Sequence, residues 1–371
     1  MTINQPLTPP IARPLAPGAT IGIFGGGQLG RMLALAAARL GFHAHIFSPL
    51  HNAPAFEVAH RTTVAPYADL NAVKEFAALV DVATVEFENI PLDTYEQAAQ
   101  FTTIAPGPTA LAIAQDRLAE KKFLDSHNIP VAPFLEINRE ADIVSAIYKL
   151  GPEGILKTQR MGYDGKGQTR FSAGTDPSLA IQAYKGEPAL YEQIVPFKME
   201  ISCVAARDFQ GNVVFYDCPR NEHRNQILAE SHVPADVSSE IEQLAQAYTA
   251  KIAEKLQYVG ILTVEFFVLG PGEQTPLIVN EIAPRVHNSG HWTMDACAFD
   301  QFENHIRAIS GWALGNTRRH SNVMMVNIVG ADMDQWSEHA GNKNAILHLY
   351  GKSETRDGRK MGHVNYLYER A

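Results

Sequence analysis

Residues 20–48 constrain the fold of this chain more than any other stretch, and they read "TIGIFGGGQLGRMLALAAARLGFHAHIFS". A short β-rich run, a glycine turn, an apolar run with helical spacing and a second β-rich run follow one another. This order predicts a β-α-β unit, and a β-α-β unit implies a parallel sheet. Gly25, Gly27 and Gly30 fit the pattern G-x-G-x-x-G at the predicted start of the helix, where main-chain amides can bind an anion.

A glycine pattern of this kind raises the question of a dinucleotide cofactor. Such sites place an acidic residue about 20 positions further on, at the end of the second strand, where it holds a ribose. Here that strand ends near Ser48, and the nearest acid, Glu57, falls in the following loop. The sequence therefore argues against a nicotinamide cofactor. Two interpretations stay open: the turn binds a phosphate or phosphoribosyl group, or it is only a tight turn.

Length and charge narrow the remaining classes of protein. A chain of 371 residues is long enough for two or three domains, and its composition, 46% hydrophobic and 19% charged, is ordinary for a globular protein. The net charge of −9 argues against nucleic acid as a partner, so a phosphate site would need a local basic cluster. No run of about 18 apolar residues indicates a membrane span. The proline-rich residues 1–19 lack a signal core and are expected to form a flexible leader, which favours a cytoplasmic protein.

The rest of the chain predicts one more α/β stretch followed by β-rich segments. The expected elements are a helix over 70–79, a strand over 82–90, a helix after Pro106–Pro108, two strands within 154–171, a helix over 237–256, and short strands and turns from residue 321 onward. Glu86 and Glu88 are expected to line the wall of the first domain. Strand alternation alone explains these two acids nearly as well.

Residues 262–282 read "LTVEFFVLGPGEQTPLIVNEI" and place two acids in strands that are otherwise apolar. The β-branched and aromatic runs on either side of a Gly/Pro turn predict a hairpin. If the pairing is symmetric about Glu273, Glu265 lies opposite Glu281, and opposed like charges destabilise a strand pair. Two such carboxylates need a shared proton or a cation, and oxygen ligands on rigid strands suit Mg²⁺. The alternative is a register slip that turns one of the acids to solvent.

A second glycine-rich loop, "RMGYDGKGQ", follows Lys157 on a predicted strand. Its glycines allow close backbone approach and closure over phosphates, although such a loop taken alone can equally be the tip of a hairpin. The Walker sequence G-x-x-x-x-G-K-[ST] does not occur, so the chain is not a P-loop protein. Arg117, Lys157, this loop, the strand segment "YEQIVPFKME" and the two strand carboxylates follow the order of an ATP-grasp enzyme.

Five separated motifs extend this likeness: "GGGQLGRML", "LKTQRMGYDGKGQ", "EQIVPFKMEIS", "VNEIAPRVHNSGHWT" and "GRKMGHV". Together they resemble the N5-carboxyaminoimidazole ribonucleotide synthetases, an ATP-grasp family of purine biosynthesis, from about residue 20 to residue 368. The resemblance implies ATP and Mg²⁺ as cofactors, a homodimer, and a combined α/β and α+β fold. The implied domains are a Rossmann-like pre-ATP-grasp domain over 20–113, an ATP-grasp domain over 114–311 with a lid subdomain at about 116–190, and a small β-rich domain over 312–371.

The resemblance assigns roles in nucleotide binding residue by residue. Arg117 and Lys157 would contact the ATP phosphates, Glu200 would hold the ribose hydroxyls, and Glu265 and Glu281 would hold Mg²⁺. The lid over the phosphates would comprise Gly162, Tyr163, Asp164, Gly165, Lys166, Gly167 and Gln168. The hinge that reads the adenine edge and the remaining nucleotide contacts would be Glu192, Gln193, Ile194, Val195, His223 and Asn280. Many ATP-grasp enzymes carry an asparagine two places after the second metal ligand, but Ala283 stands there, so the number of protein ligands stays open.

The loop "APRVHNSGHW" directly follows the second predicted metal ligand. Arg285 lies four residues past Glu281, and its guanidinium suits a transferring phosphate or bicarbonate, although the loop alone could be a polar turn. The tail "KSETRDGRKMGH" holds four basic residues within nine positions. These residues can form a phosphate-binding pocket or merely a solvated charged turn. The resemblance favours the functional interpretation of both. It makes Lys157, Arg285 and His287 catalytic, and it assigns substrate binding to Gly26, Gly27, Gln28, Leu29, Tyr163, Asp164, Arg285, His287, Asn288, Ser289, Lys352, Arg359 and Lys360.

The predicted reaction is the ATP- and bicarbonate-dependent carboxylation of 5-aminoimidazole ribonucleotide, through carboxyphosphate, to N5-carboxyaminoimidazole ribonucleotide. The partners would thus be small molecules only. One alternative is a related ATP-grasp ligase, such as a formate-dependent glycinamide ribonucleotide transformylase, which should lack the pairing of "RVHNSGH" with "GRKMGH". A second is a nucleotide-binding regulatory protein with a decayed active site. The sequence argues against it, because a decayed site should have lost functional residues and this chain retains Lys157, Glu265, Glu281 and Arg285. A Rossmann dehydrogenase is the third, and failure to bind NAD would dismiss it.

Overall fold

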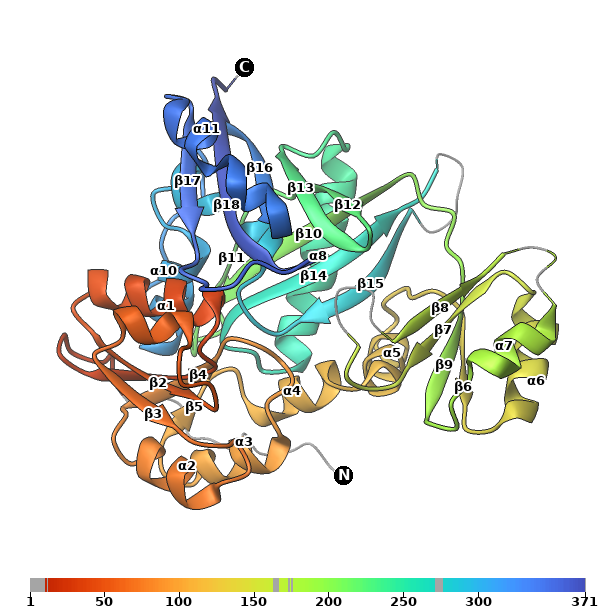
Figure 1. Cartoon of the computed structure of the whole chain (residues 1–371), viewed down its shortest axis with the longest axis horizontal. Coiled ribbons are helices and arrows are strands. Elements are labelled where there is room, and N and C mark those ends of the chain that lie inside the picture. Colours follow the sequence, from red (N-terminus) through yellow and green to blue (C-terminus); the bar gives the residue numbers. More distant parts are fainter. Residues whose placement is uncertain are drawn as a thin grey trace.

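The computed structural model describes residues 11, 13–162, 167–172, 174, 176–270 and 276–370 of the chain. Within these residues the strands form three sheets, which lie beside one another in Figure 1. Residues 1–10 and 12 of the expected leader over 1–19 and the turn centre Glu273 lie outside this part. The lid residues Tyr163, Asp164, Gly165 and Lys166 also lie outside the described residues.

The first sheet confirms the predicted parallel β-α-β unit. Its five strands are all parallel and run in the order β3-β2-β1-β4-β5. The strands are β1 (Thr20–Phe24), β2 (His43–Ser48), β3 (Arg61–Val64), β4 (Val82–Val85) and β5 (Thr103–Ile104). The helical segments that connect and flank them are α1 (Gln28–Arg39), η1 (Pro54–Val58), α2 (Leu70–Ala77), α3 (Leu92–Ala99) and α4 (Pro108–Ala114).

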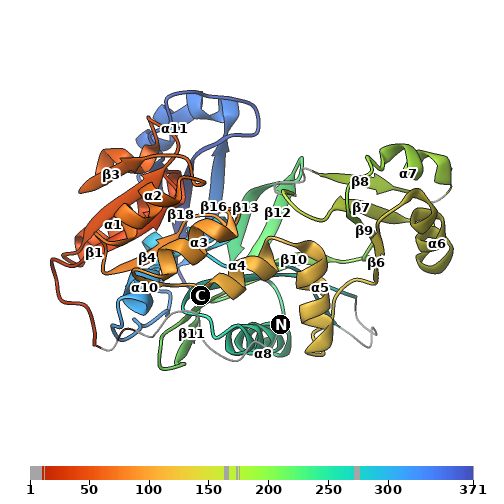
Figure 2. The same ribbon diagram turned by 90° about the horizontal axis from the view of Figure 1, so that it is seen from below.

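The second sheet is antiparallel and has four strands in the order β6-β9-β7-β8. Its strands are β6 (Phe134–Ile137), β7 (Gly154–Thr158), β8 (Gln168–Phe171) and β9 (Ala189–Gln193). Helices α6 (Glu140–Leu150) and α7 (Pro177–Ala183) pack on one side of this sheet, and α5 (Arg117–Ser126) lies between it and the rest of the molecule (Figure 2).

The third sheet has nine strands and carries most of the remaining chain. Eight of them follow the order β15-β14-β10-β12-β13-β16-β18-β17, and β11 pairs with β10. Its strands are β10 (Met199–Arg207), β11 (Val213–Phe215), β12 (Arg220–Arg224), β13 (Ile227–Val233), β14 (Gly260–Val268), β15 (Leu277–Ala283), β16 (Asn322–Val329), β17 (Ala345–Leu349) and β18 (Lys360–Tyr368). The helical segments around it are α8 (Ser239–Lys255), η2 (Asn288–Gly290), α9 (Thr293–Ala296), α10 (Gln301–Ile309), η3 (Gly330–Gln335) and α11 (Trp336–Gly341).

One hydrophobic core joins the first and third sheets. Leu33 of α1 and Ile309 of α10 are both fully buried in it, and the two helices pack directly against each other. Burying an aliphatic side chain of this size stabilises a fold by about 1.5–3 kcal/mol. The packing therefore fixes the glycine turn before α1 relative to the nine-stranded sheet. Among the described residues, no helix combines the length and the apolar character that a membrane crossing requires.

The sequence-based elements differ from the structure in three places. The strand expected over 82–90 ends at Val85, because residues 86–89 turn away from the sheet as a bend and turn. The helix expected after Pro108 is two helices, because α4 ends at Ala114 and Asp116 caps α5 by accepting hydrogen bonds from Leu118 N and Ala119 N. The tail contains η3 and α11 as well as strands.

Candidate active site

Glu265 on β14 and Glu281 on β15 stand opposite each other in register, which confirms the predicted pairing. The register shifts by one residue between Glu265 and Phe266, so that Asn280 is the extra residue of a β-bulge. The Glu265 side chain is only 15% exposed, whereas Glu281 is exposed. Burial, followed by the charge of Glu281, raises the pKa of Glu265 to about 7. A bound cation would relieve this repulsion between the two carboxylates.

The loop after β15 brings His287 to the carboxylate pair. His287 Nε2 lies 3.3 Å from Glu265 Oε1, and His287 Nδ1 lies 2.9 Å from Ser289 Oγ. Burial and the charge of Arg285 hold the pKa of His287 well below its ordinary value. The imidazole is therefore neutral at neutral pH and can donate one hydrogen bond while it accepts another.

Arg285 is held by a carboxylate of the first domain. Its Nε donates to Glu88 Oε2 at 2.5 Å, and its Nη2 donates to Glu88 Oε1 at 3.2 Å. Burial alone would raise the pKa of Glu88, but the charge and hydrogen bonds of Arg285 lower it. The two-point contact orients the guanidinium from a segment 197 residues away in the chain. Glu88 was expected only to line the wall of the first domain, but it also binds Arg285 directly.

Asn288 and Ser289 use their side chains within the protein. Asn288 and Asn327 exchange two hydrogen bonds, with Nδ2-to-Oδ1 distances of 2.9 and 2.5 Å. Ser289 Oγ lies 2.6 Å from Ser202 Oγ, and both serines are fully buried. These contacts fasten the loop to β10 and β16. A substrate role for the two side chains stays a prediction.

The glycine turn before α1 holds a carboxylate of its own chain. Glu86 accepts hydrogen bonds from Gly27 N and from Gly30 N, the latter at 2.7 Å, so it occupies the place where an anion was expected. A Cβ on Gly25 would lie 2.2 Å from Glu86 Cγ, and one on Gly27 would lie 2.7 Å from Glu86 Oε1. The glycines therefore make room for Glu86. A phosphate at Gly26, Gly27, Gln28 and Leu29 would have to share these amides with Glu86 or displace it.

The C-terminal tail lies against the same turn. A Cβ on Gly351 would lie 2.9 Å from Glu57 Oε2, so the tail contacts η1 next to the glycine turn. Burial raises the pKa of Glu86, and the hydrogen bonds from Gly30 and Gly27, followed by the charge of Lys352, act against that rise. Lys352 Nζ donates to Lys360 O at 2.6 Å. After burial and the charge of Arg285, the charge of Lys360 also lowers the pKa of His287, and it lowers the pKa of Glu265 as well, so Lys360 acts on the carboxylate side of the site.

Arg359 lies in the same basic tail. Its Nη1 donates to Glu354 O at 2.8 Å, which orders the turn that precedes β18. The structure therefore brings Lys352 and Lys360 toward the glycine turn and the carboxylates, and holds Arg359 in the adjoining turn. Their role in substrate binding stays a prediction.

The predicted phosphate contacts surround the start of α5. Arg117 Nη1 donates to Thr158 O at 2.8 Å, directly after Lys157 on β7. A Cβ on Gly162 would lie 2.0 Å from Arg117 Nη1, so Gly162 packs on the guanidinium. Gly167 O accepts from Thr158 N at 2.8 Å and closes the described end of the loop. These contacts bring Arg117, Lys157, Gly162 and Gly167 together as expected.

The predicted hinge and ribose residues lie at the start of β10 and the end of β9. Gln193 N donates to Pro133 O at 2.9 Å, and Ile194 and Val195 follow as partly buried residues. Glu200 Oε2 lies 2.5 Å from His223 Nδ1. Burial would lower the pKa of His223, but its hydrogen bond with Glu200 and the charge of that carboxylate raise it. Gln168 pairs with Lys157 across β7 and β8.

Sequence reasoning missed two residues of this region, Glu120 and Lys121. Glu120 Oε2 accepts from Ile282 N at 3.1 Å, and Lys121 Nζ donates to Asn280 O at 3.2 Å, so both bracket Glu281. Burial, followed by the charge of Glu281, raises the pKa of Glu120 to about 8. Their spacing of three and four residues from Arg117 places them on the same helix face, and that signal was available in the sequence.

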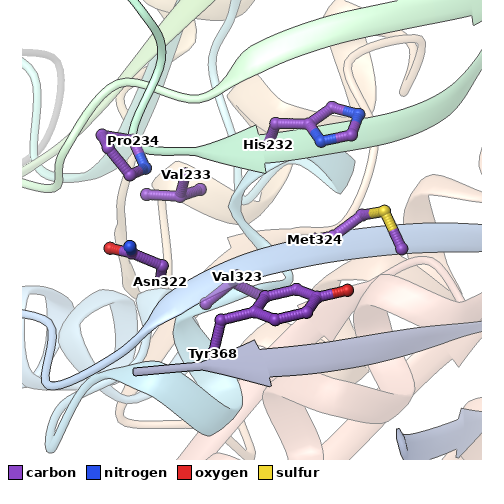
Figure 3. A pocket seen from close by; sticks show the side chains of 7 residues that line it. All are labelled: His232, Val233, Pro234, Asn322, Val323, Met324 and Tyr368. Atoms are coloured by element: carbon purple, nitrogen blue, oxygen red, sulfur yellow. The ribbon is translucent and has the colours of Figure 1, made fainter. Parts of the chain in front are cut away.

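A separate hollow lies at the ends of β13, β16 and β18 (Figure 3). Its lining is mostly apolar and consists of His232, Val233, Pro234, Asn322, Val323, Met324 and Tyr368. His232 also lies near Glu222 and Glu230, and the three could hold a metal ion. Arginines already pair with both carboxylates, Arg220 with Glu222 and Arg224 with Glu230. The hollow offers no cluster of cations for a nucleotide or a sugar phosphate.

Comparison with protein families matches nearly the whole chain in three parts. A ribonucleotide synthetase preATP-grasp domain matches residues 18–115 and an ATP-grasp domain matches residues 122–302. A phosphoribosylaminoimidazole carboxylase C-terminal domain matches residues 323–371. The expected fold, an ATP-grasp domain between a pre-ATP-grasp domain and a C-terminal part, is thereby confirmed.

Individual proteins give the same result. The chain is 48% identical over 358 residues to N5-carboxyaminoimidazole ribonucleotide synthase of Brucella melitensis, covering 96% of this chain and 98% of that protein. A crystal structure of an ADP complex of N5-carboxyaminoimidazole ribonucleotide synthetase superposes with a TM-score of 0.93 at 39% identity, covering 97% of this chain and 95% of the other. The Aspergillus clavatus synthase in complex with ADP and 5-aminoimidazole ribonucleotide superposes with a TM-score of 0.88 at 29% identity, covering 95% and 94%.

Proposed function

Because the chain belongs to the N5-carboxyaminoimidazole ribonucleotide synthase family, we propose that it carboxylates 5-aminoimidazole ribonucleotide with ATP and bicarbonate. The products are N5-carboxyaminoimidazole ribonucleotide, ADP and phosphate, and the step belongs to purine biosynthesis. The observation that carries the proposal is the opposed carboxylate pair, Glu265 and Glu281, beside the loop of Arg285 and His287. This arrangement is what a phosphoryl transfer to a small anion requires.

The reaction has two steps. A bicarbonate oxygen attacks the γ-phosphorus of ATP, the bond to the bridging oxygen breaks, and ADP and carboxyphosphate form. The exocyclic amine then attacks the carboxyl carbon, phosphate leaves, and the amine releases a proton. Arg117, Lys157 and Arg285 bind and orient the anions, which supplies most of the catalysis in phosphoryl transfer. Glu88 supports this role because it fixes the direction of the Arg285 guanidinium.

Mg²⁺ fits the carboxylate pair, and Glu265 and Glu281 would hold it. Both offer the hard oxygen ligands that this ion prefers, and burial together with the charge of Glu281 raises the pKa of Glu265, an unfavourable effect that a bound cation would relieve. When bound, the ion supplies charge neutralisation at the phosphates of ATP. His287, kept neutral by burial, lies beside Glu265 without adding a further positive charge to the site.

The ribonucleotide substrate is proposed to lie between the glycine turn and the basic tail. Lys352, Arg359 and Lys360 would bind its 5′-phosphate together with Gly26, Gly27, Gln28 and Leu29. Two observations support this placement: the charge of Lys352 acts on the pKa of Glu86, and Gly351 lies against η1. Glu86 would then exchange its amide partners for a hydroxyl of the substrate. Tyr163 and Asp164 of the lid are proposed to close over the imidazole.

The proposal is tested by phosphate release from Mg·ATP and bicarbonate, with and without 5-aminoimidazole ribonucleotide. Release should rise sharply with the ribonucleotide, and Glu281→Gln should reduce it by at least about a hundredfold, because a metal ligand is lost. Glu254→Gln, at an exposed position of α8, is the matched control and should keep full activity. Phosphate release that does not respond to the ribonucleotide would refute 5-aminoimidazole ribonucleotide as the substrate. No phosphate release at all would refute the proposal that the protein is an enzyme of this class.

We also propose that the protein is a cytoplasmic homodimer. The family resemblance supports the dimer, and light scattering at several concentrations measures it. The division into domains over 20–113, 114–311 and 312–371 is likewise a proposal.

A further inference from the structure

Three buried charged side chains form one cluster at the junction of α5 and the four-stranded sheet. Glu192 of β9 is paired through Oε1 with Lys121 Nζ at 2.6 Å and through Oε2 with Lys157 Nζ of β7. The three side chains are at most 11% exposed. Buried ions occur in proteins mostly as compensated pairs, because an unpaired buried charge is strongly unfavourable. A carboxylate shared by two lysines is an exception that calls for a reason.

The cluster is cationic as a whole. Two positive charges and one negative charge leave a net charge of +1. Burial would raise the pKa of Glu192, but Lys121 and Lys157 lower it to about 2, so the carboxylate stays ionised. Burial lowers the pKa of Lys157 while Glu192 raises it, and the charge of Arg117 reaches the same lysine. The site therefore collects positive charge around Lys157.

Lys121 also connects the cluster to the strand of the carboxylate pair. Its Nζ donates to Asn280 O at 3.2 Å, one residue before Glu281. Arg117 lies one helical turn before Lys121 on α5. Lys121 therefore lies between the residues proposed for the phosphates, Arg117 and Lys157, and a residue proposed for the metal.

We propose that Lys121 is a positioning residue for the phosphates of ATP: by sharing the carboxylate of Glu192 with Lys157, it leaves a positive charge that attracts those phosphates. With Glu192 as its sole partner, Lys157 would form a neutral pair and would attract a phosphate only weakly. The proposal rests on the proposed function only in that ATP is the nucleotide bound. It assigns to the Glu192 side chain a role distinct from the adenine-binding backbone of the hinge.

The test changes the charge of the cluster by substitution and measures, by calorimetry with Mg²⁺ present, the affinities for β,γ-imido-ATP and for AMP. We call this set of variants the charge cycle. Lys121→Met lowers the net charge of the cluster to zero and should weaken β,γ-imido-ATP binding by about tenfold, because one charge acts on the phosphates at short range. AMP lacks the β- and γ-phosphates, so its binding should change by less than about twofold. Adding Glu192→Gln to Lys121→Met restores the charge and should recover most of the lost affinity. The control is Lys122→Met, whose side chain is 60% exposed on the same helix.

A role in packing alone gives a different result. Lys121→Met would then weaken both nucleotides equally, or the double variant would bind β,γ-imido-ATP more weakly than Lys121→Met, and either result overturns the proposal. If Lys121→Met does not fold, Lys121→Gln replaces it, because glutamine can keep a hydrogen bond to Asn280 O. Ribonucleotide-dependent phosphate release by the unaltered protein tests the proposed function separately. If phosphate release does not respond to the ribonucleotide but the binding affinities change as expected, the proposed substrate is refuted and the role of Lys121 still holds.

Discussion

Glu86 satisfies the start of α1 from a segment 59 residues away. The helix has no side-chain cap at Gly27 and no acid in its first turn, so its free amides need an external acceptor. The Glu86 carboxylate supplies one, and a negative charge at a helix N-terminus is itself stabilising. The glycines at 25, 27 and 30 allow the carboxylate to come this close.

Substitution of Gly27 by alanine should test this contact. The new Cβ would lie 2.7 Å from Glu86 Oε1, so the carboxylate must leave the amide of residue 27. We expect a loss of about 1–3 kcal/mol in the free energy of unfolding, together with a higher KM for 5-aminoimidazole ribonucleotide. Urea denaturation and steady-state kinetics measure the two effects.

Gly107→Ala is the matched control for this substitution. Gly107 is also an N-cap glycine, before α4, and its Cβ would meet no atom within 4 Å. It should change stability by no more than about 0.5 kcal/mol. Equal losses in the two variants would mean that the cap position, and not the contact with Glu86, determines the effect.

At the scale of single residues, the sequence predicted the contacts between side chains that lie close together in the chain. The opposition of Glu265 and Glu281 follows from a hairpin with a short connection, and it was found. The bonds from Glu88 to Arg285 and from Lys121 to Glu192 join segments far apart in the chain. Strand alternation and helix periodicity say which face a residue occupies, but not which distant segment meets that face. These partners therefore required the structure.

Helix α10 joins the first sheet to the third through one buried histidine. His305 Nδ1 accepts from Ile261 N at 3.1 Å, and His305 Nε2 lies 2.8 Å from Thr84 Oγ1. Because Nδ1 is an acceptor, Nε2 carries the proton and the ring is neutral. Burial lowers the pKa of His305 from 6.5 to about 3. Protonation would therefore break the bond to Ile261.

The stability of the protein should fall in acid partly because of His305. Between its pKa values of 6.5 unfolded and about 3 folded, the unfolded chain binds the extra proton, so stability is lost as pH falls through this window. The contribution is about 2 kcal/mol between pH 6.5 and pH 5. His305→Gln should make the dependence of the unfolding free energy on pH shallower over this range. His320→Gln, at an exposed position, should leave it unchanged, and an unchanged slope in His305→Gln would contradict the assignment.

Among whole elements, those with strong local patterns were predicted and the short connecting ones were not. The β-α-β unit, the hairpin and the helix over about 237–256 were found, with α8 at Ser239–Lys255. Asp116 was not recognised as a cap that divides α4 from α5, because a capping residue also occurs within turns. Helix α11 has six residues, and no side chain in it is buried, so it has no apolar stripe to be recognised.

At the scale of the molecule, the nucleotide is expected to tie the four-stranded sheet to the nine-stranded one. Lys157 and Glu192 belong to the first of these, Glu281 to the second, and α5 contacts both. Mg·β,γ-imido-ATP should therefore slow amide hydrogen exchange in α5, β7, β9 and β15. Exchange in α2 and β3, which lie at the far side of the first sheet, should not change (Figure 1). Slowing spread evenly over all three sheets would instead indicate a general stabilisation by binding.

The nine-stranded sheet also bears on how far the chain can be divided. The C-terminal family match begins at residue 323, but that residue already pairs with Val233 of β13, and the ladder continues to β17. A shortened protein that stopped before β16 would leave the edge of β13 with unpaired main-chain groups, a template for self-association. The C-terminal part is therefore no exchangeable module: a chimaera that swaps it must also supply strands that complete the sheet.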